Sequence, residues 1–163
     1  MQLILHWANQ NNMWINEDQI NIEEHIGFVY QIENIQTGKK YIGKKSLIST
    51  RTKKLGVRAM AAQEGKKGRK KTKETVVRES DWQRYWGSDD ELKQDVETLG
   101  KENFVRTILR LCTSKKELSY YEEKFMFINE VLDDSDKWYN KNIGGTYFRR
   151  DVQKINLCLD NKE

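Results

Sequence analysis

The feature that most constrains this fold is a pair of short extended runs joined by a turn within residues 27–43. In the first run Phe28, Tyr30 and Ile32 alternate with the intervening residues, and a period of two is typical of a β-strand. The turn contains Gly38, which can adopt a positive φ at no steric cost. The second run resumes the extended pattern, so the segment predicts a β-hairpin.

Three segments downstream of the hairpin are also regular. Residues 104–112 are rich in β-branched and apolar side chains, which indicates a third strand. Capping-box patterns at Ser88 and Ser114 predict helices that run to about Leu99 and Leu132. The second helix would face the core with a stripe of apolar residues spaced by three or four: Leu118, Tyr121, Phe125, Ile128 and Leu132. The order of elements predicts a small α/β (α+β) domain, with a three-stranded antiparallel sheet flanked by helices.

The length and composition exclude several classes of protein. A chain of 163 residues is enough for one domain. No apolar run approaches the roughly 20 residues that a membrane span needs, and the N-terminus lacks the pattern of a secretory signal. Two cysteines and two histidines lie far apart, which excludes a zinc cluster and fits a reducing compartment. We expect a cytoplasmic protein without a membrane partner, and an oligomeric state that the sequence leaves open.

Positive charge is concentrated in residues 51–78, which hold eleven Lys and Arg residues against two acids, whereas the rest of the chain is net acidic. Dense cations bind nucleic-acid phosphates whatever the base sequence, so this segment predicts a contact with DNA. The alternative is a solvated loop with no partner. Its centre, from Gln63 to Lys73, is expected to be a mobile loop. The candidate DNA-binding residues within it are Lys66, Lys67, Arg69, Lys70 and Lys71.

The predicted hairpin carries groups that could act on a phosphodiester. Hydrolysis needs a nucleophilic water, a cation at the phosphate oxygens and help for the departing oxygen. A tyrosine ionises only near pH 10, so a phenolate at neutral pH needs cations beside it. Lys44 and Lys45 directly follow Tyr41, and strand pairing could bring them near Tyr30. A carboxylate that holds one Mg²⁺ would add the largest local positive charge.

The hairpin resembles the GIY-YIG nuclease family, whose two short motifs lie on adjacent strands of a small three-stranded sheet. The second motif, Tyr41-Ile42-Gly43, matches letter for letter, whereas Phe28-Val29-Tyr30 departs from Gly-Ile-Tyr but keeps the tyrosine. A basic residue, a helix carboxylate and an asparagine follow in the order of the family. Several further blocks, among them Tyr85-Trp86-Gly87-Ser88, are similar to phage-encoded members.

The resemblance covers about residues 26–148, with the basic stretch at about 51–78 as an insertion. It implies that residues 1–25 are an N-terminal extension and that residues 149–163 are a C-terminal tail. Patterning in the first segment has no clean period, which predicts an irregular or partly helical lead-in.

The resemblance implies a role for each polar group around the hairpin. Tyr30 would activate the attacking water, directly or through hydrogen bonding, and Tyr41 would position the water or the phosphate. Arg51, together with Lys44 or Lys45, would neutralise the phosphate oxygens.

The metal ligand and a supporting amide are implied in the same way. Glu122 would bind Mg²⁺ or Mn²⁺, and Asn140 would steady the site and contact the nucleic acid. The neighbouring Glu123 stays an alternative ligand, because helical periodicity favours Glu122 only modestly.

The function implied is a metal-dependent endodeoxyribonuclease that hydrolyses phosphodiester bonds, of a phage homing or DNA-degrading type. The alternative is a catalytically inactive nucleic-acid-binding module on the same fold, which the altered first motif keeps open. A structural protein with an incidental basic loop is a third, weaker interpretation.

Overall fold

A computed structural model describes residues 13–61 and 72–152 of the chain. The main sheet has the strand order β1-β6-β2-β3. Its strands are β1 (Trp14–Ile15), β2 (Gly27–Asn34), β3 (Lys40–Ser46) and β6 (Phe104–Cys112). The predicted hairpin and third strand form the antiparallel unit β6-β2-β3, and the short strand β1 adds a parallel edge beside β6. The α+β prediction is therefore confirmed, with one strand more than expected.

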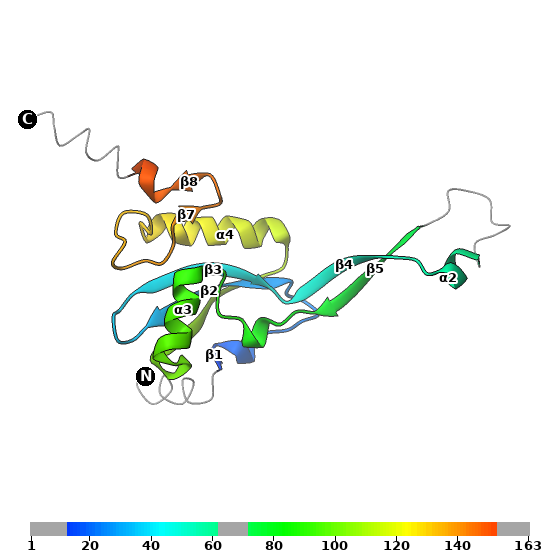
Figure 1. Cartoon of the computed structure of the whole chain (residues 1–163), viewed down its shortest axis with the longest axis horizontal. Coiled ribbons are helices and arrows are strands. Elements are labelled where there is room, and N and C mark those ends of the chain that lie inside the picture. The colour runs from blue at the N-terminus through cyan, green and yellow to red at the C-terminus, as the bar shows by residue number, and fades with distance from the viewer. Residues whose placement is uncertain (1–12, 62–71, 153–163) are drawn as a thin grey trace, which may run out of the picture.

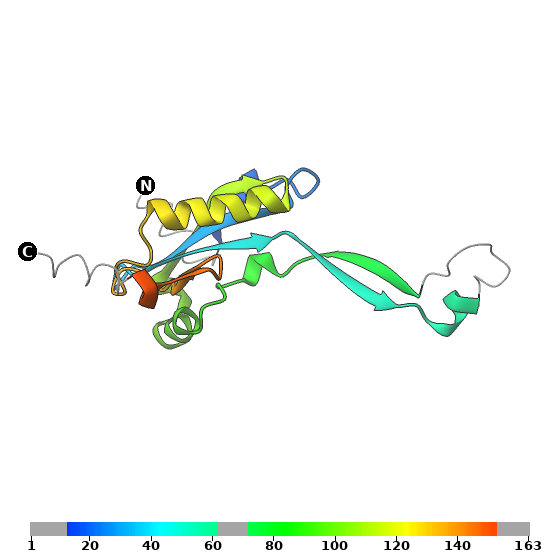
Figure 2. The ribbon, with the colours of Figure 1, turned by 90° about the horizontal axis from the view of Figure 1, so that it is seen from above.

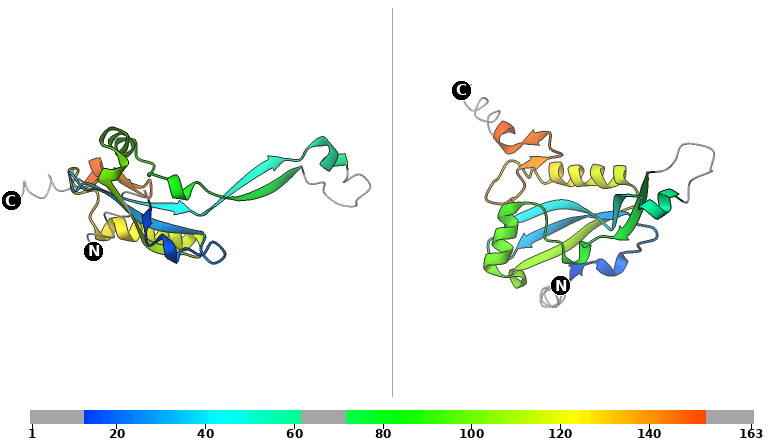
Figure 3. Two further views of the ribbon diagram at one scale, coloured as in Figure 1. Left: turned by 90° about the horizontal axis from the view of Figure 1, so that it is seen from below. Right: turned by 45° about the vertical axis from the view of Figure 1, so that its right-hand side comes forward.

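Two helices cover opposite faces of this sheet, as Figures 1 and 3 show. They are α3 (Asp90–Leu99) and α4 (Lys115–Ile128). Alternation along β2 sends Phe28, Tyr30 and Ile32 into the cluster that contains the α3 side chains, and Val29 into the cluster of α4. The period of two seen in the sequence therefore separates two cores, one on each face.

Six further elements of the described chain are short. They are η1 (Glu17–Gln19), α2 (Val57–Ala61), η2 (Trp82–Arg84), η3 (Lys101–Asn103), β7 (Asn142–Ile143) and β8 (Tyr147–Phe148). None of the described helices is long and apolar enough to cross a membrane.

The ends of both main helices differ in part from the predictions. Helix α3 is capped by Asp89, whose carboxylate accepts bonds from the backbone N–H groups of Glu91 and Leu92, so the predicted cap at Ser88 is wrong by one residue. Ser114 caps α4 as predicted. The C-terminus of α4 is earlier than expected, because the chain turns after Ile128.

The early end of α4 changes which apolar residues are buried. Ile128, expected on the core-facing stripe, is exposed. Val131 and Leu132 fill the core from the turn that follows the helix. The turn is stabilised by Arg149, whose Nη2 donates to the carbonyl oxygens of Val131, Trp138 and Asn140 at 2.6–3.1 Å.

The lead-in before β2 contributes to the core. Trp14 is buried against Phe28 and Tyr30 and donates its indole N–H to the carbonyl of Trp82. Its ring also stacks on the buried guanidinium of Arg106, which lies between Trp14 and Trp86. Burial lowers the pKa of Arg106 to about 10, so the group stays charged at neutral pH.

The basic segment forms a projecting arm rather than a loop over its described length. Strands β4 (Ile48–Lys54) and β5 (Lys73–Glu79) pair in antiparallel register and extend away from the body (Figures 1 and 2). The chain enters the arm after Leu47 and leaves it at Ser80, whose N–H donates to the Leu47 carbonyl. The predicted mobile loop lies mostly at residues 62–71, outside the described residues, and so do the five candidate DNA-binding residues Lys66, Lys67, Arg69, Lys70 and Lys71.

Candidate active site

The two motif tyrosines lie side by side at the edge strand β3. Tyr30 on β2 and Tyr41 on β3 both belong to the core on the α3 side, and their ring centroids are 6.1 Å apart. Gly43 makes this approach possible. A Cβ at residue 43 would lie 2.6 Å from the Tyr30 hydroxyl and 2.8 Å from Cε1 of Tyr41, closer than side chains approach each other. The glycine of the second motif is therefore required by packing.

Burial controls the protonation of both phenols. Desolvation raises the pKa of Tyr30 well above its ordinary value, and Tyr41, Tyr85 and the carboxylate of Glu122 raise it further. Desolvation also raises the pKa of Tyr41, against a lowering by its hydrogen bond with Ser88. Both tyrosines are therefore protonated at neutral pH in this structure, and both lie within the electrostatic influence of Glu122.

The acid predicted as the metal ligand lies across the β3 edge from the tyrosines. Glu122 on α4 forms an ion pair of 2.7 Å with Lys44, whose ammonium also donates to the Ser119 hydroxyl at 3.0 Å. The Glu122 side chain is only 14% exposed, so the charge is partly shielded from solvent. Lys44 points to the α4 side of β3, and Tyr41 packs on the other side.

These groups line one polar cleft of about 450 Å³ at the edge of β3, which we call the tyrosine cleft. Tyr41, Lys44 and Glu122 all contribute to its wall, whereas Tyr30 lies behind Gly43 and does not. Glu123 also lines this cleft, near Gly144. The loop around β7 lies against Glu123, so both the predicted ligand and its alternative face the same cleft.

A hydroxyl and a second carboxylate complete the wall near Tyr41. The Tyr41 and Ser88 hydroxyls are 2.9 Å apart, and Asp89, the cap of α3, lines the cleft beside them. The sequence predicts only a helix cap at Ser88. Because Asp89 caps the helix, the Ser88 hydroxyl is free to bond Tyr41. The Ser-Asp-Asp sequence does not reveal which of its residues is the cap.

Asn140 acts on the backbone of the second motif. Its Nδ2 donates to the Ile42 carbonyl at 2.8 Å, and its Oδ1 accepts from the Ile42 N–H at 2.9 Å. The side chain is buried, so these bonds are shielded from water. Asn140 therefore holds the edge strand β3 in place between Tyr41 and Gly43, and Arg149 fixes its carbonyl in turn.

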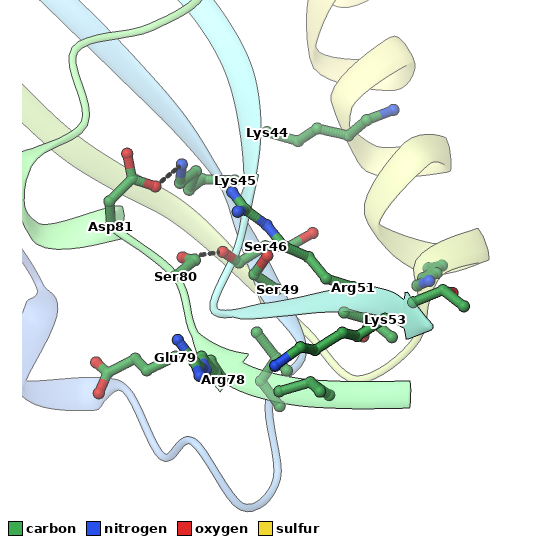
Figure 4. Close-up of a pocket in the computed structure, with 15 residues that line it drawn as sticks. Lys44, Lys45, Ser46, Ser49, Arg51, Lys53, Arg78, Glu79, Ser80 and Asp81 are labelled. Carbon is green, nitrogen blue, oxygen red and sulfur yellow. Dashed lines mark hydrogen bonds and ion pairs between the residues drawn. The ribbon is translucent and has the colours of Figure 1, made fainter. Parts of the chain in front are cut away.

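The other predicted cations line a different and larger space. Lys45 forms an ion pair of 2.6 Å with Asp81, and its ammonium lies 3.8 Å from the ring centroid of Tyr85. Arg51 lies on β4 in the arm, exposed. Both line a cleft of about 1,100 Å³ between the body and the arm, the arm cleft, in which Figure 4 shows the Lys45–Asp81 pair. Lys44 is shared by the two clefts.

The residues of the tyrosine cleft fit a divalent cation of the Mg²⁺ type. Mg²⁺ is commonly held by one or two carboxylates together with waters and phosphate oxygens. Glu122 and Glu123 supply such carboxylates in an open polar cleft. No group of three or more acidic, histidine or cysteine side chains gathers in the described ranges 13–61 and 72–152, so a cage made of protein ligands alone is not built there.

Paired tyrosines on adjacent strands, a glycine that lets them meet and a helix carboxylate at the sheet edge define a GIY-YIG domain. Residues 7–143 match the family model described as "Putative endonuclease segE, GIY-YIG domain". The match covers most of the chain, which therefore belongs to this SegE-type GIY-YIG family. No curated protein and no solved structure gave a significant match.

Proposed function

We propose that the chain is a metal-dependent DNA endonuclease that hydrolyses phosphodiester bonds in the tyrosine cleft. The observation that carries the proposal is the convergence of Tyr41, Lys44 and Glu122 on one cleft at the β3 edge. The family description points to the same class of activity. The products would be a 5′-phosphate and a 3′-hydroxyl, and the use of the enzyme would be phage homing or DNA degradation.

Glu122 would hold the metal, with Glu123 as the neighbouring carboxylate. Bound Mg²⁺ would supply positive charge that polarises the phosphate and lowers the pKa of an attacking water. Lys44 now neutralises Glu122, and release of this ammonium would free a cation for the phosphate oxygens. The same lysine would then balance the charge that develops in the transition state.

The two tyrosines would act as neutral hydrogen-bonding groups. Tyr41 reaches the cleft and shares a hydrogen bond with Ser88, so its hydroxyl can orient the water or the phosphate. Tyr30 is almost fully buried, and its raised pKa disfavours a phenolate. Tyr30 would therefore support water activation through hydrogen bonding behind Gly43 rather than by removing the proton itself. Asn140 would position β3, and Arg51 would contribute from the arm cleft.

The burial of Tyr30 also favours a second candidate, a nucleic-acid-binding module without turnover. One assay separates the two. Plasmid DNA at low salt is incubated with the protein in Mg²⁺, in Mn²⁺ or in EDTA, and nicking and retardation are measured together. The nuclease predicts cutting that requires metal and is lost in Glu122→Ala and reduced in Tyr30→Phe. Retardation without cutting in either metal would support the binding module. The absence of both retardation and cutting would contradict both candidate functions.

A further inference from the structure

The arm formed by β4 and β5 has little packing of its own. Nearly all its side chains beyond Ser49 are exposed, among them Val77 at 61%. An isolated two-stranded ribbon is marginally stable in water and usually needs a surface to pack against. The arm is instead anchored to the body at its base, where the Ser80 hydroxyl donates to the Ser46 carbonyl at 2.6 Å.

The two faces of the arm differ in what they meet. Strand register puts Arg51 opposite Val76 and Arg78 opposite Ser49, so these residues share one face with Lys53. All three cations line the arm cleft, and Figure 4 shows them around it. Lys54 and Lys73 are opposite each other on the other face and do not line the cleft, although Thr50, Thr52 and Glu79 of that face do.

The cations of the cleft face are available to a ligand. Within the described parts of the chain, Arg51, Lys53 and Arg78 form no ion pair. The acids that line the cleft are engaged: Glu79 accepts from the Trp82 indole, and Asp81 holds Lys45 and has its pKa lowered by that bond. The cleft therefore presents positive charge to whatever enters it.

The arm cleft and the tyrosine cleft are separate but adjoin at Lys44, which lines both. A polyanion that lies along Arg78, Arg51 and Lys44 would run from the arm to Glu122. Such a ligand carries several phosphates, and a two-stranded ribbon with cations on one face can lie along the phosphates that border a duplex groove.

We propose that the arm grips duplex DNA, with its Arg51/Lys53/Arg78 face on the phosphates that flank the bond presented to the tyrosine cleft. The contact is with the backbone, so the arm contributes affinity and register rather than base specificity. This inference rests on the proposed endonuclease function for the identity of the ligand, but it concerns binding and can fail independently.

The test compares two double variants that each remove two charges from the arm. Lys53→Gln/Arg78→Gln changes the cleft face, and Lys54→Gln/Lys73→Gln changes the opposite face. Binding of the full chain to a labelled 30-base-pair duplex and to its single strand is measured in EDTA over a range of salt. The unfolding midpoint of each variant checks that the body is intact.

We expect the cleft-face variant to bind the duplex at least about tenfold more weakly. Its plot of log affinity against log salt should also be shallower by roughly 2, because about 0.9 is lost per phosphate contact. The opposite-face variant should change affinity less than about threefold. Equal losses in the two variants, no loss in either, or the same loss on the single strand would overturn the proposal.

These outcomes separate the arm from the endonuclease activity. If the native protein cuts DNA with Mg²⁺ but both variants bind alike, the arm proposal fails and the function stands. If the native protein does not cut in any metal but the cleft-face variant alone loses duplex binding, the function fails and the arm proposal stands.

Discussion

The body and the arm of this protein handle polar groups in opposite ways. In the body, Arg106 is enclosed by Trp14 and Trp86, and Asn140 has both ends of its amide bonded to one backbone residue. In the arm, Arg51 and Lys53 extend into solvent with no such partner among the described residues. The body uses its polar side chains to fix geometry, whereas those of the arm are exposed to solvent.

The difference has a consequence for the proposed catalytic groups. The tyrosine cleft needs Tyr41, Lys44 and Glu122 in fixed positions, and these come from a strand and a helix that share a core. The arm, which we propose binds DNA, contributes little to that core. Substitutions in the body should therefore cost stability, and substitutions in the arm should cost binding.

The largest loss of stability is expected for Asn140→Ala. The substitution leaves both backbone groups of Ile42 without partners in a buried position, which costs roughly 2–4 kcal/mol of unfolding free energy. Urea unfolding measures the loss. Asn129→Ala is the control, because the amide of Asn129 bonds the Phe125 carbonyl at an exposed helix end and its removal should cost under about 1 kcal/mol. Equal losses of unfolding free energy in the two variants would contradict this role of Asn140.

Gly43→Ala should have the next largest effect. The new Cβ would collide with the rings of Tyr30 and Tyr41, which costs about 1–3 kcal/mol and displaces the Tyr41 hydroxyl from the cleft. Thermal unfolding and DNA cleavage should both suffer. The arm offers the control Gly56→Ala, where an added Cβ meets nothing within 4 Å. A stable, fully active Gly43→Ala protein would show that the two rings do not meet as described.

A smaller, pH-dependent effect is expected from Tyr30. The pKa of Tyr30 is raised in the folded state. Its contribution to stability is therefore complete below the pKa of an unfolded tyrosine, about 10, and is lost as the pH rises from there toward the pKa of the folded state. Between pH 8 and pH 10.5 the unfolding free energy of the native protein should fall by about 1 kcal/mol because of this group. The Tyr30→Phe variant should not show that part of the fall. Urea midpoints at the two pH values measure it. An identical decline in both proteins would mean that Tyr30 ionises in the folded state.

The smallest effect on stability should come from removing the arm. Ile48 and Glu79 are opposite each other in the ladder, so a two-glycine turn can replace residues 49–78. The unfolding free energy should change by less than about 1 kcal/mol, because the arm buries little apolar surface. Thermal unfolding measures the change, and a loss above about 3 kcal/mol would show that the arm belongs to the cooperative body.

Local patterns in the sequence were enough to predict the parts of the fold that depend on near neighbours. The alternation through Phe28, Tyr30 and Ile32 predicted the hairpin, and the cap at Ser114 predicted the start of α4. The cap of α3 was missed by one residue because Ser88 and Asp89 are both good caps. The strand β1 could not be predicted, since two residues show no period and Trp14 is placed by distant rings.

The arm was also beyond sequence patterning. The density of lysine and arginine suggested a loop, and the sequences of β4 and β5 have no alternation of apolar and polar residues that would indicate a strand. In the candidate site, the resemblance named Tyr30, Tyr41 and Glu122, and the structure brings them to one edge of the sheet. The resemblance could not show that Arg51 and Lys45 line a separate cleft, or that Ser88 reaches Tyr41, because both contacts depend on how distant segments pack.

The central claim is that the carboxylate on the α4 face of the tyrosine cleft carries metal-dependent cleavage. The most direct measurement is the Mg²⁺ dependence of plasmid nicking by Glu122→Gln beside Glu123→Gln, two substitutions that each remove one charge from adjacent positions without changing side-chain size. We predict that Glu122→Gln loses at least about a hundredfold in rate while its DNA retardation in EDTA is unchanged, and that Glu123→Gln loses less than about tenfold. Nicking by Glu122→Gln at the native rate and the native Mg²⁺ dependence would contradict the account.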